Sequence, residues 1–133
     1  MDAKQLFTLL KVTYTNCYFG SYEELNIILD SATFPCAVVV PVSKRVQYIA
    51  DRFKVVETVV IASLSKMELD YETSAIYDTV KSLEKKLLKA VYSKTSQIQS
   101  IQCLSELNKF DANVAFACYS LEIVNDPICP ESA

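Results

Sequence analysis

Acidic side chains are the first residues of this 133-residue chain whose types and spacing could do chemistry. Glu68, Asp70 and Glu72 alternate, so three carboxylates on one edge could bind a hard cation. A solvated loop that caps the following helix is the favoured interpretation, because no glycine turn or further oxygen-rich segment accompanies the acids. A histidine-free enzyme could work through carboxylates such as Asp51, Glu57, Glu68 and Asp70, but such pairs do acid–base work only where their pKa values are split, and the spacing does not show that these converge.

Five cysteines offer a second kind of chemistry. None lies in a CxxC pair, so their spacing does not predict a zinc site, and an odd number argues against a disulfide framework. Cys36 and Cys118 lie within apolar runs, where a thiol packs as a small hydrophobic group. We expect these two to be buried and structural, and Cys129 to be the most exposed.

The residue types that are missing exclude whole classes of site. The chain has no histidine, which removes Ser-His-Asp and Cys-His catalysis within it. A single glycine cannot build a GxGxxG or GxxxxGK[ST] phosphate loop, which excludes Rossmann and Walker nucleotide binding. The sequence therefore predicts no catalytic, cofactor-binding or metal-ligating residue and no cofactor.

Charge and hydropathy limit the partners. The formal net charge is −3, so neutralisation of a phosphate backbone and sequence-specific nucleic-acid binding are not expected. Apolar runs such as residues 37–40 are far shorter than the roughly 18 residues of a membrane helix. Residues 1–4 lack the layout of a secretory signal, so we expect an intracellular protein with no membrane partner.

Two surface patterns remain open. Lys81, Lys85 and Lys89 recur every four residues, which could form a basic docking stripe but is more typical of the solvated face of a helix. The tyrosines could be core packing or a protein–protein surface, and we leave both interpretations open. They gather around Gly20 and at the start of a predicted helix, as Tyr14, Tyr18, Tyr22, Tyr71 and Tyr77.

The elements that would position these residues follow from hydrophobic periodicity. Apolar positions three and four apart predict a helix over residues 2–15, and Ser21 with Glu24 predicts a capping box that opens a second helix ending near residues 30–31. The longest amphipathic stripe predicts a helix over 71–93. Strand character marks residues 36–40, 46–50, 54–66, 97–106 (with a bulge) and 112–124.

The order of these elements predicts the fold class. Helices that do not alternate one for one with strands indicate an α+β fold. We expect a mainly antiparallel sheet of four to five strands, packed on one face by the long central helix and the N-terminal helices. Residues 1–133 would form a single domain, with 125–133 as an extended C-terminal tail.

Several segments, taken in this order, carry a family resemblance. They are Phe34-Pro35 before Ala37-Val38-Val39-Val40-Pro41, then Glu57-Thr58-Val59-Val60-Ile61, Leu69-Asp70 before the helix, Ile76-Tyr77-Asp78 with Val80 and Leu83 within it, and Phe110-Asp111-Ala112-Asn113 before Val114-Ala115-Phe116. With them the chain resembles the tail-terminator, tail-completion and head–tail connector proteins of tailed bacteriophages. The resemblance spans nearly the whole chain.

The resemblance implies a non-enzymatic structural subunit of the virion, assembled in the host cytoplasm as a ring at the head–tail junction or the tail end. Its partners would be copies of itself and portal, connector or tail proteins. Ring contacts need exposed strand edges or loops, and we expect them at residues 35–42 and 125–133, with 126–130 extending along a neighbouring subunit. The alternative is a small intracellular protein–protein binding module that uses a sheet edge.

Overall fold

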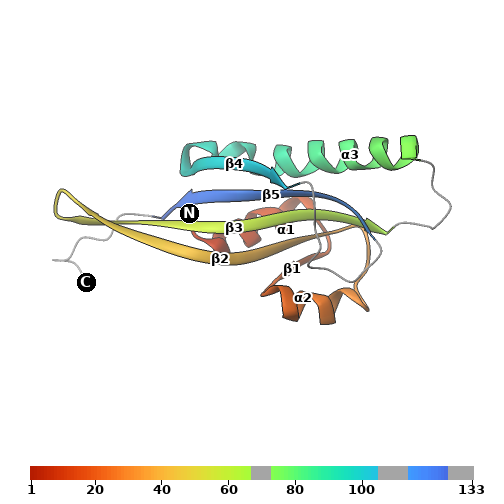
Figure 1. Cartoon of the computed structure of the whole chain (residues 1–133), viewed down its shortest axis with the longest axis horizontal. Coiled ribbons are helices and arrows are strands. Elements are labelled where there is room, and N and C mark those ends of the chain that lie inside the picture. Colours follow the sequence, from red (N-terminus) through yellow and green to blue (C-terminus); the bar gives the residue numbers. More distant parts are fainter. Residues whose placement is uncertain (67–72, 105–113, 126–133) are drawn as a thin grey trace.

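One five-stranded sheet forms the centre of the molecule (Figure 1). A computed structural model describes residues 1–66, 73–104 and 114–125. The strands lie in the order β1-β2-β3-β5-β4, with β1 parallel to β2 and every other pair antiparallel. Their bounds are β1 Cys17–Phe19, β2 Cys36–Ile49, β3 Arg52–Lys66, β4 Ile98–Leu104 and β5 Val114–Val124.

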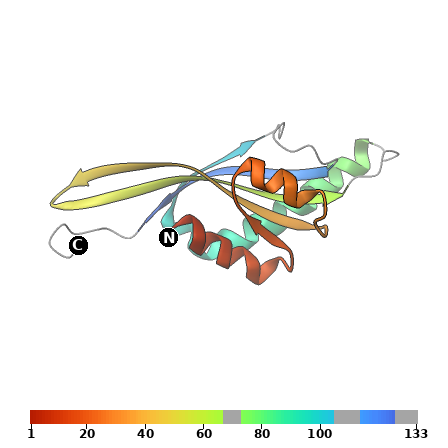
Figure 2. The same ribbon diagram turned by 90° about the horizontal axis from the view of Figure 1, so that it is seen from below.

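Helices cover both faces of this sheet. Helices α1 (Ala3–Thr13) and α3 (Thr73–Val91) lie on one face, and α2 (Tyr22–Leu29) lies on the other (Figure 2). A short 3-10 helix, η1 (Tyr92–Gln97), links α3 to β4. The predicted α+β class is confirmed: a five-stranded, mostly antiparallel sheet carries a long helix and the N-terminal helices. The expectation that all these helices pack on one face is wrong in one detail, because α2 takes the face opposite α1 and α3.

The larger core lies between the sheet and helices α1 and α3. Leu6 and Leu10 of α1 and Leu87 of α3 are completely buried against Ile61 and Leu121 of the central strands. The four-residue step between Leu6 and Leu10 puts both side chains on one face of the helix. These side chains are removed from water only when that face packs against the sheet. The burial of each leucine therefore stabilises the folded state by about 1.5–3 kcal/mol.

A second, smaller core lies under α2. Leu25 and Leu29 pack on Val38, Ala62 and Leu64, whose side chains point to the face opposite the larger core. Alternate residues of β2 and β3 therefore enter different cores, which explains why residues 36–40 are apolar without a break.

One predicted exposure in β3 is wrong. The sequence suggests that Glu57, Ser63 and Ser65 bring their face of the strand partly toward water. Ser65 is half-buried, but Glu57 and Ser63 are buried. Helices α1 and α3 cover this face, and each of the two buried polar groups finds a partner there. The Tyr14 hydroxyl donates to the Ser63 hydroxyl at 3.0 Å, and the Asn125 amide donates to Glu57 at 3.0 Å.

The N-terminal elements differ in detail from their predictions. Asp2 caps α1, accepting from the Gln5 amide at 2.8 Å while the Gln5 side chain accepts from the Asp2 amide at 2.9 Å. Ser21 accepts from the Glu24 amide as predicted, but the Glu24 carboxylate accepts from the Ser21 hydroxyl and not from a backbone amide. The segment between the two helices, expected only as a break, contains β1.

Proline 41 does not end its strand. The segments 36–40 and 46–50, predicted as two strands, belong to a single β2, and the pairing register shifts between Pro41 and Ser43. Such a bulge accommodates a residue that lacks an amide donor. The bulge predicted in β4 is confirmed by a register shift between Ile98 and Ser100.

Candidate functional site: a projecting hairpin

Strands β2 and β3 continue well beyond the rest of the sheet as a two-stranded hairpin (left end of Figure 1). The pairing of β1 with β2 covers only residues 37–39, and β5 accompanies β3 only as far as Val56. Residues 41–45 pair with the part of β3 that β5 also borders, and from residue 46 to residue 55 the two strands pair only with each other among the described residues, apart from one backbone hydrogen bond to Val55. We call residues 41–55 the hairpin arm.

A two-residue turn closes the arm. Ala50 and Asp51 both have positive φ values, 49° and 62°, and they join the paired residues Ile49 and Arg52. Two consecutive left-handed residues match the right-handed twist of the flanking strands, as in a type I′ hairpin turn. The Tyr48 hydroxyl donates to the Asp51 carboxylate at 2.9 Å, which holds the turn against the strand.

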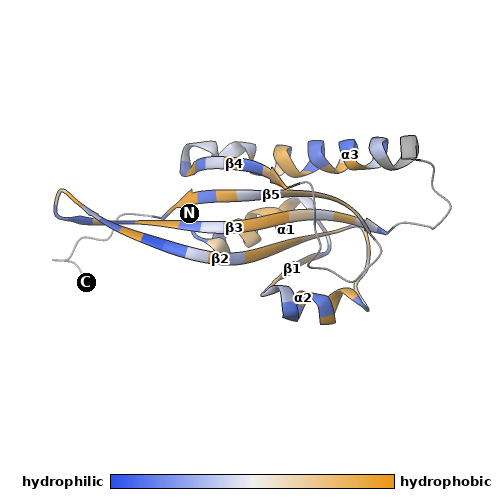
Figure 3. Cartoon of the chain, in the orientation of Figure 1, coloured by the Kyte–Doolittle hydropathy of each residue, from blue (hydrophilic) through white to orange (hydrophobic). Residues whose placement is uncertain are grey.

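One face of the arm is apolar, and three of its four side chains are exposed, whereas Val55 at the base is buried. Val46 pairs with Val55 and Tyr48 with Phe53, and cross-strand partners point to the same face. The rings of Tyr48 and Phe53 lie 5.4 Å apart between centroids. Tyr48 is nevertheless 61% exposed and Val46 60%. Apolar side chains exposed on a projection are typical of a surface that contacts another macromolecule. Figure 3 shows the alternation of hydrophobic and hydrophilic residues along the arm as orange and blue segments at the left.

The opposite face of the arm is basic. Ile49 pairs with Arg52 and Gln47 with Lys54, so these four side chains alternate with the apolar set. Nearer the sheet, Arg45 lies 3.4 Å from a carboxylate oxygen of Glu122. Arg52 and Lys54 make no ion pair with any residue that the structure describes. The tip of the arm therefore carries two cations beside an exposed isoleucine, the exposed Arg52 and the half-buried Lys54, and one acid, Asp51, whose carboxylate accepts from Tyr48.

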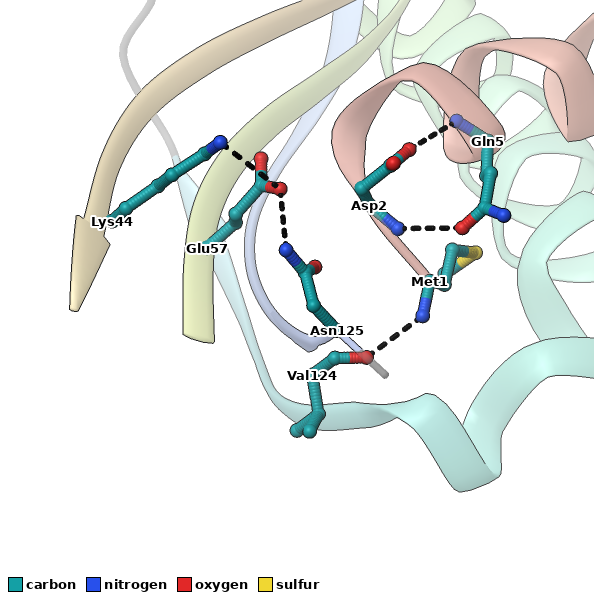
Figure 4. A network of polar contacts seen from close by, with 7 residues as sticks. All are labelled: Met1, Asp2, Gln5, Lys44, Glu57, Val124 and Asn125. Carbon is teal, nitrogen blue, oxygen red and sulfur yellow. Dashed lines mark hydrogen bonds and ion pairs between the residues drawn. The ribbon is translucent and has the colours of Figure 1, made fainter. Parts of the chain in front are cut away.

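A network of polar contacts holds the base of the arm (Figure 4). The buried Glu57 carboxylate accepts from Asn125 and lies 3.9 Å from the Lys44 ammonium. The backbone amide of Asn125 donates to the Val55 carbonyl at 2.9 Å, and the Met1 amino group donates to the Val124 carbonyl at 2.8 Å. The end of β5 and the start of α1 are thereby tied to β3 where the arm leaves the sheet.

The buried thiols fit a structural role. Cys36 and Cys118 are buried as predicted, and burial raises the pKa of each to about 12. Burial also raises the pKa of Cys17 to about 11. All three are thus protonated at neutral pH, where a thiol is a weak nucleophile. Cys103 on β4 is exposed, and Cys129 lies outside the described residues.

The carboxylates considered for catalysis are not brought together. Asp51 lies in the turn of the arm, whereas Glu57 lies at its base, about 20 Å away at 3.3 Å per strand residue. Glu68, Asp70 and Glu72 lie outside the described residues, so their cation hypothesis is not tested. Within the ranges the structure covers, no three acidic, cysteine or histidine side chains form a group that could hold a metal ion.

The structure places the lysine and tyrosine side chains without deciding between their alternative interpretations. Lys81, Lys85 and Lys89 are all exposed on α3, which both the solvated-face and the docking-stripe interpretations require. Tyr14 is buried, and the ammonium of Lys86 lies 4.5 Å above its ring. Tyr18 and Tyr22 pack against the smaller core, whereas Tyr77 is exposed and Tyr71 lies outside the described residues.

Of the two ring-contact segments expected from the sequence, only one can be assessed. Residues 36–40 of the segment 35–42 are buried in the sheet, and the exposed edge begins at Pro41 and continues to Ile49. The tail proposed to reach a neighbour, residues 126–130, lies outside the described residues. A signal for the arm was present in the sequence, because Val46, Tyr48, Phe53 and Val55 are symmetric about residues 50–51. It was missed because Ala50-Asp51 is not the Asn-Gly or Asp-Gly pair typical of such turns.

Comparison with protein-family models gives no match, and comparison with curated proteins gives none either. Among the described helices, none has both the length and the apolar character that a bilayer crossing requires. The geometry that any functional proposal has to explain is the hairpin arm.

Proposed function

We propose that this chain is a non-enzymatic structural subunit of a bacteriophage virion that assembles with copies of itself as a ring at the head–tail junction or the tail end. Portal, connector or tail proteins would be its neighbours, and assembly would take place in the host cytoplasm. In this role the chain has no cofactor, no membrane partner and no sequence-specific contact with nucleic acid.

The hairpin arm is the observation that carries this proposal. A two-stranded projection gains little from exposing Val46, Tyr48 and Ile49 to water, because each would be stabilised by burial. Isolated hairpins are marginal on their own, so a long one is best explained by a surface that receives it. A subunit that contacts its neighbours through such a projection associates by shape and burial, which needs no reactive group.

The chemistry of the side chains supports the non-enzymatic part of the proposal. The raised pKa values of Cys17, Cys36 and Cys118 keep these thiols protonated near neutral pH. Glu57 is buried in a contact with Asn125 that braces the arm, a structural use of the one buried carboxylate among the described residues.

The second candidate function, a small intracellular binding module, is favoured by a different observation. Strand β4 is an outer strand of the sheet, and residues 99–103 along it are exposed. It contains no proline or lysine, the residues that commonly protect an edge strand from pairing with another chain. A peptide could add to this edge as a further strand.

The mass of the purified full chain in solution separates the two functions. For a ring subunit we expect light scattering after size exclusion to give a mass that rises with concentration to a fixed multiple of 14.9 kDa. A fixed multiple is expected because closed symmetry limits the number of copies. A mass that stays at one chain across the concentration range would contradict self-assembly and favour the binding module.

A further inference from the structure

Two cations of the hairpin arm, Arg52 and Lys54, flank an exposed apolar side chain, and the one acid of the turn, Asp51, accepts a hydrogen bond from Tyr48. Ile49 is 54% exposed, and its cross-strand partner is Arg52, with Lys54 next along the same face. An isoleucine flanked by two positive charges is a small, defined docking element.

The outer face of α2 has the same design with the opposite charge. Ile27 is 76% exposed, and the residues four before, three before and three after it are Glu23, Glu24 and Asp30. Residues at these spacings are neighbours on a helix surface, so three exposed carboxylates surround the isoleucine. No basic residue occurs between positions 21 and 31.

These two surfaces cannot meet within one molecule. Helix α2 packs on residues 36–40 of β2, and the arm ends at Ile49 of the same strand. Nine residues of extended strand, about 30 Å at 3.3 Å per residue, separate them. In both views the tip of the arm lies at the left end of the molecule, and α2 lies away from it, over the part of the sheet right of the middle (Figures 1 and 2).

From this complementarity we infer that the basic face of the hairpin arm of one copy docks on the outer face of α2 of the next copy. Ile49 contacts Ile27, while Arg52 and Lys54 face Glu23 and Asp30. The inference rests on the proposed function and specifies which surfaces of the subunit meet.

The contact is heterologous, because a different patch of each copy takes part. Such contacts leave a free arm at one end and a free α2 at the other until rotation closes a ring. The apolar centre supplies burial, while the charges set which partner is accepted and make association weaker at high salt.

Charge reversal on each surface tests the inference. The tip variant carries Arg52→Glu and Lys54→Glu, and the helix variant carries Glu23→Lys and Asp30→Lys. Glu24 is left unchanged because it contributes to the N-terminal cap of α2. We expect each variant alone to associate at least about tenfold more weakly than the wild-type chain, because like charges then face each other.

Mixing the two variants gives the decisive result. The tip variant has an acidic arm and an acidic α2, and the helix variant has a basic arm and a basic α2. In the mixture, the arm of each variant therefore meets an α2 of opposite charge on the other variant. We expect an equimolar mixture, and also a single chain carrying all four substitutions, to recover association to within about threefold of wild type. The matched control, Lys81→Glu with Lys85→Glu on the exposed face of α3, should leave association unchanged.

The outcomes distinguish this inference from the function on which it rests. If the wild-type chain assembles and both variants assemble equally well, or mixing restores nothing, the arm–helix contact is wrong while self-assembly stands. If the wild-type chain is monomeric at every concentration, both fail. A monomeric chain whose arm binds an anionic polymer such as duplex DNA, with binding lost in the tip variant, would give the arm a different partner and overturn the inference.

Discussion

Shortening the hairpin arm is expected to abolish self-association and leave the fold intact. Replacing residues 47–54 by Asn-Gly would join the paired residues Val46 and Val55 through a type I′ turn. No residue of either hydrophobic core is removed, so the free energy of unfolding should stay within about 1 kcal/mol of wild type. Light scattering should give the mass of a single chain at concentrations where the wild-type chain assembles.

A matched control separates the arm from its turn. Replacing only Ala50 and Asp51 by Asn-Gly introduces the same turn in an arm of full length, and association should persist. If the shortened chain still assembles while its circular dichroism spectrum and unfolding midpoint match those of wild type, the arm is not the assembly surface. If the control also becomes monomeric, the turn sequence and not the arm length is responsible.

Alkaline unfolding is the second large effect. Burial raises the pKa of Cys36 and Cys118 from 9.0 to about 12, so in the folded state each of these thiols keeps a proton that the unfolded state releases above pH 9, and Cys17, with its pKa raised to about 11, adds a smaller effect in the same direction. The contribution of these groups to the free energy of unfolding is fully present below pH 9 and is lost as the pH rises toward 12. In that window Cys36 and Cys118 each lower the free energy of unfolding by about 1.4 kcal/mol per pH unit. At pH 11 the two together lower it by roughly 5 kcal/mol, which is comparable with the whole stability of a small domain.

Denaturant unfolding at pH 8, 9, 10 and 11 measures this loss. The Cys118→Ala variant should have a shallower decline, because one of the two buried titrating thiols is gone. The Cys103→Ser variant changes an exposed thiol and should follow the wild-type profile. A stability that does not change up to pH 11, or equal slopes in wild type and Cys118→Ala, would show that these thiols do not titrate as their burial implies.

Periodicity was enough to predict the fold class and the position of most elements. The stripe through Leu83, Leu87 and Val91 gave the long helix, and these three side chains are buried as expected. The apolar run at residues 36–40 predicted a strand, and its lack of polar residues has a physical reason, because α1 covers one face of this strand and α2 covers the other. These predictions succeeded because the residues on the buried face of a helix or strand are apolar and recur with the period of that element.

The hairpin arm could not be predicted in the same way. Its residues alternate as any half-exposed strand does, and Pro41 interrupts the pattern that would join residues 36–40 to 46–50. Periodicity shows which face of a strand is apolar, but not whether a neighbouring strand covers it. That depends on where β1 and β5 end, at Phe19 and Val124, which is a property of the whole sheet.

The burial of Glu57 was unpredictable for a related reason. A glutamate in a strand is normally a sign of exposure, because burying an unpaired carboxylate is costly. Asn125 lies 68 positions away in the sequence, and only the pairing of β3 with β5 brings its amide to the carboxylate. A long-range partner of this kind leaves no local pattern.

Hydrogen exchange of the unmodified full chain at two concentrations tests most directly whether the arm is the surface through which this protein assembles. At a concentration where the scattered mass exceeds one chain, backbone amides of residues 44–54 should exchange several-fold more slowly than in the dilute sample, while those on the exposed face of α3 should not change. Equal exchange of the arm amides at both concentrations, despite the rise in mass, would contradict the account.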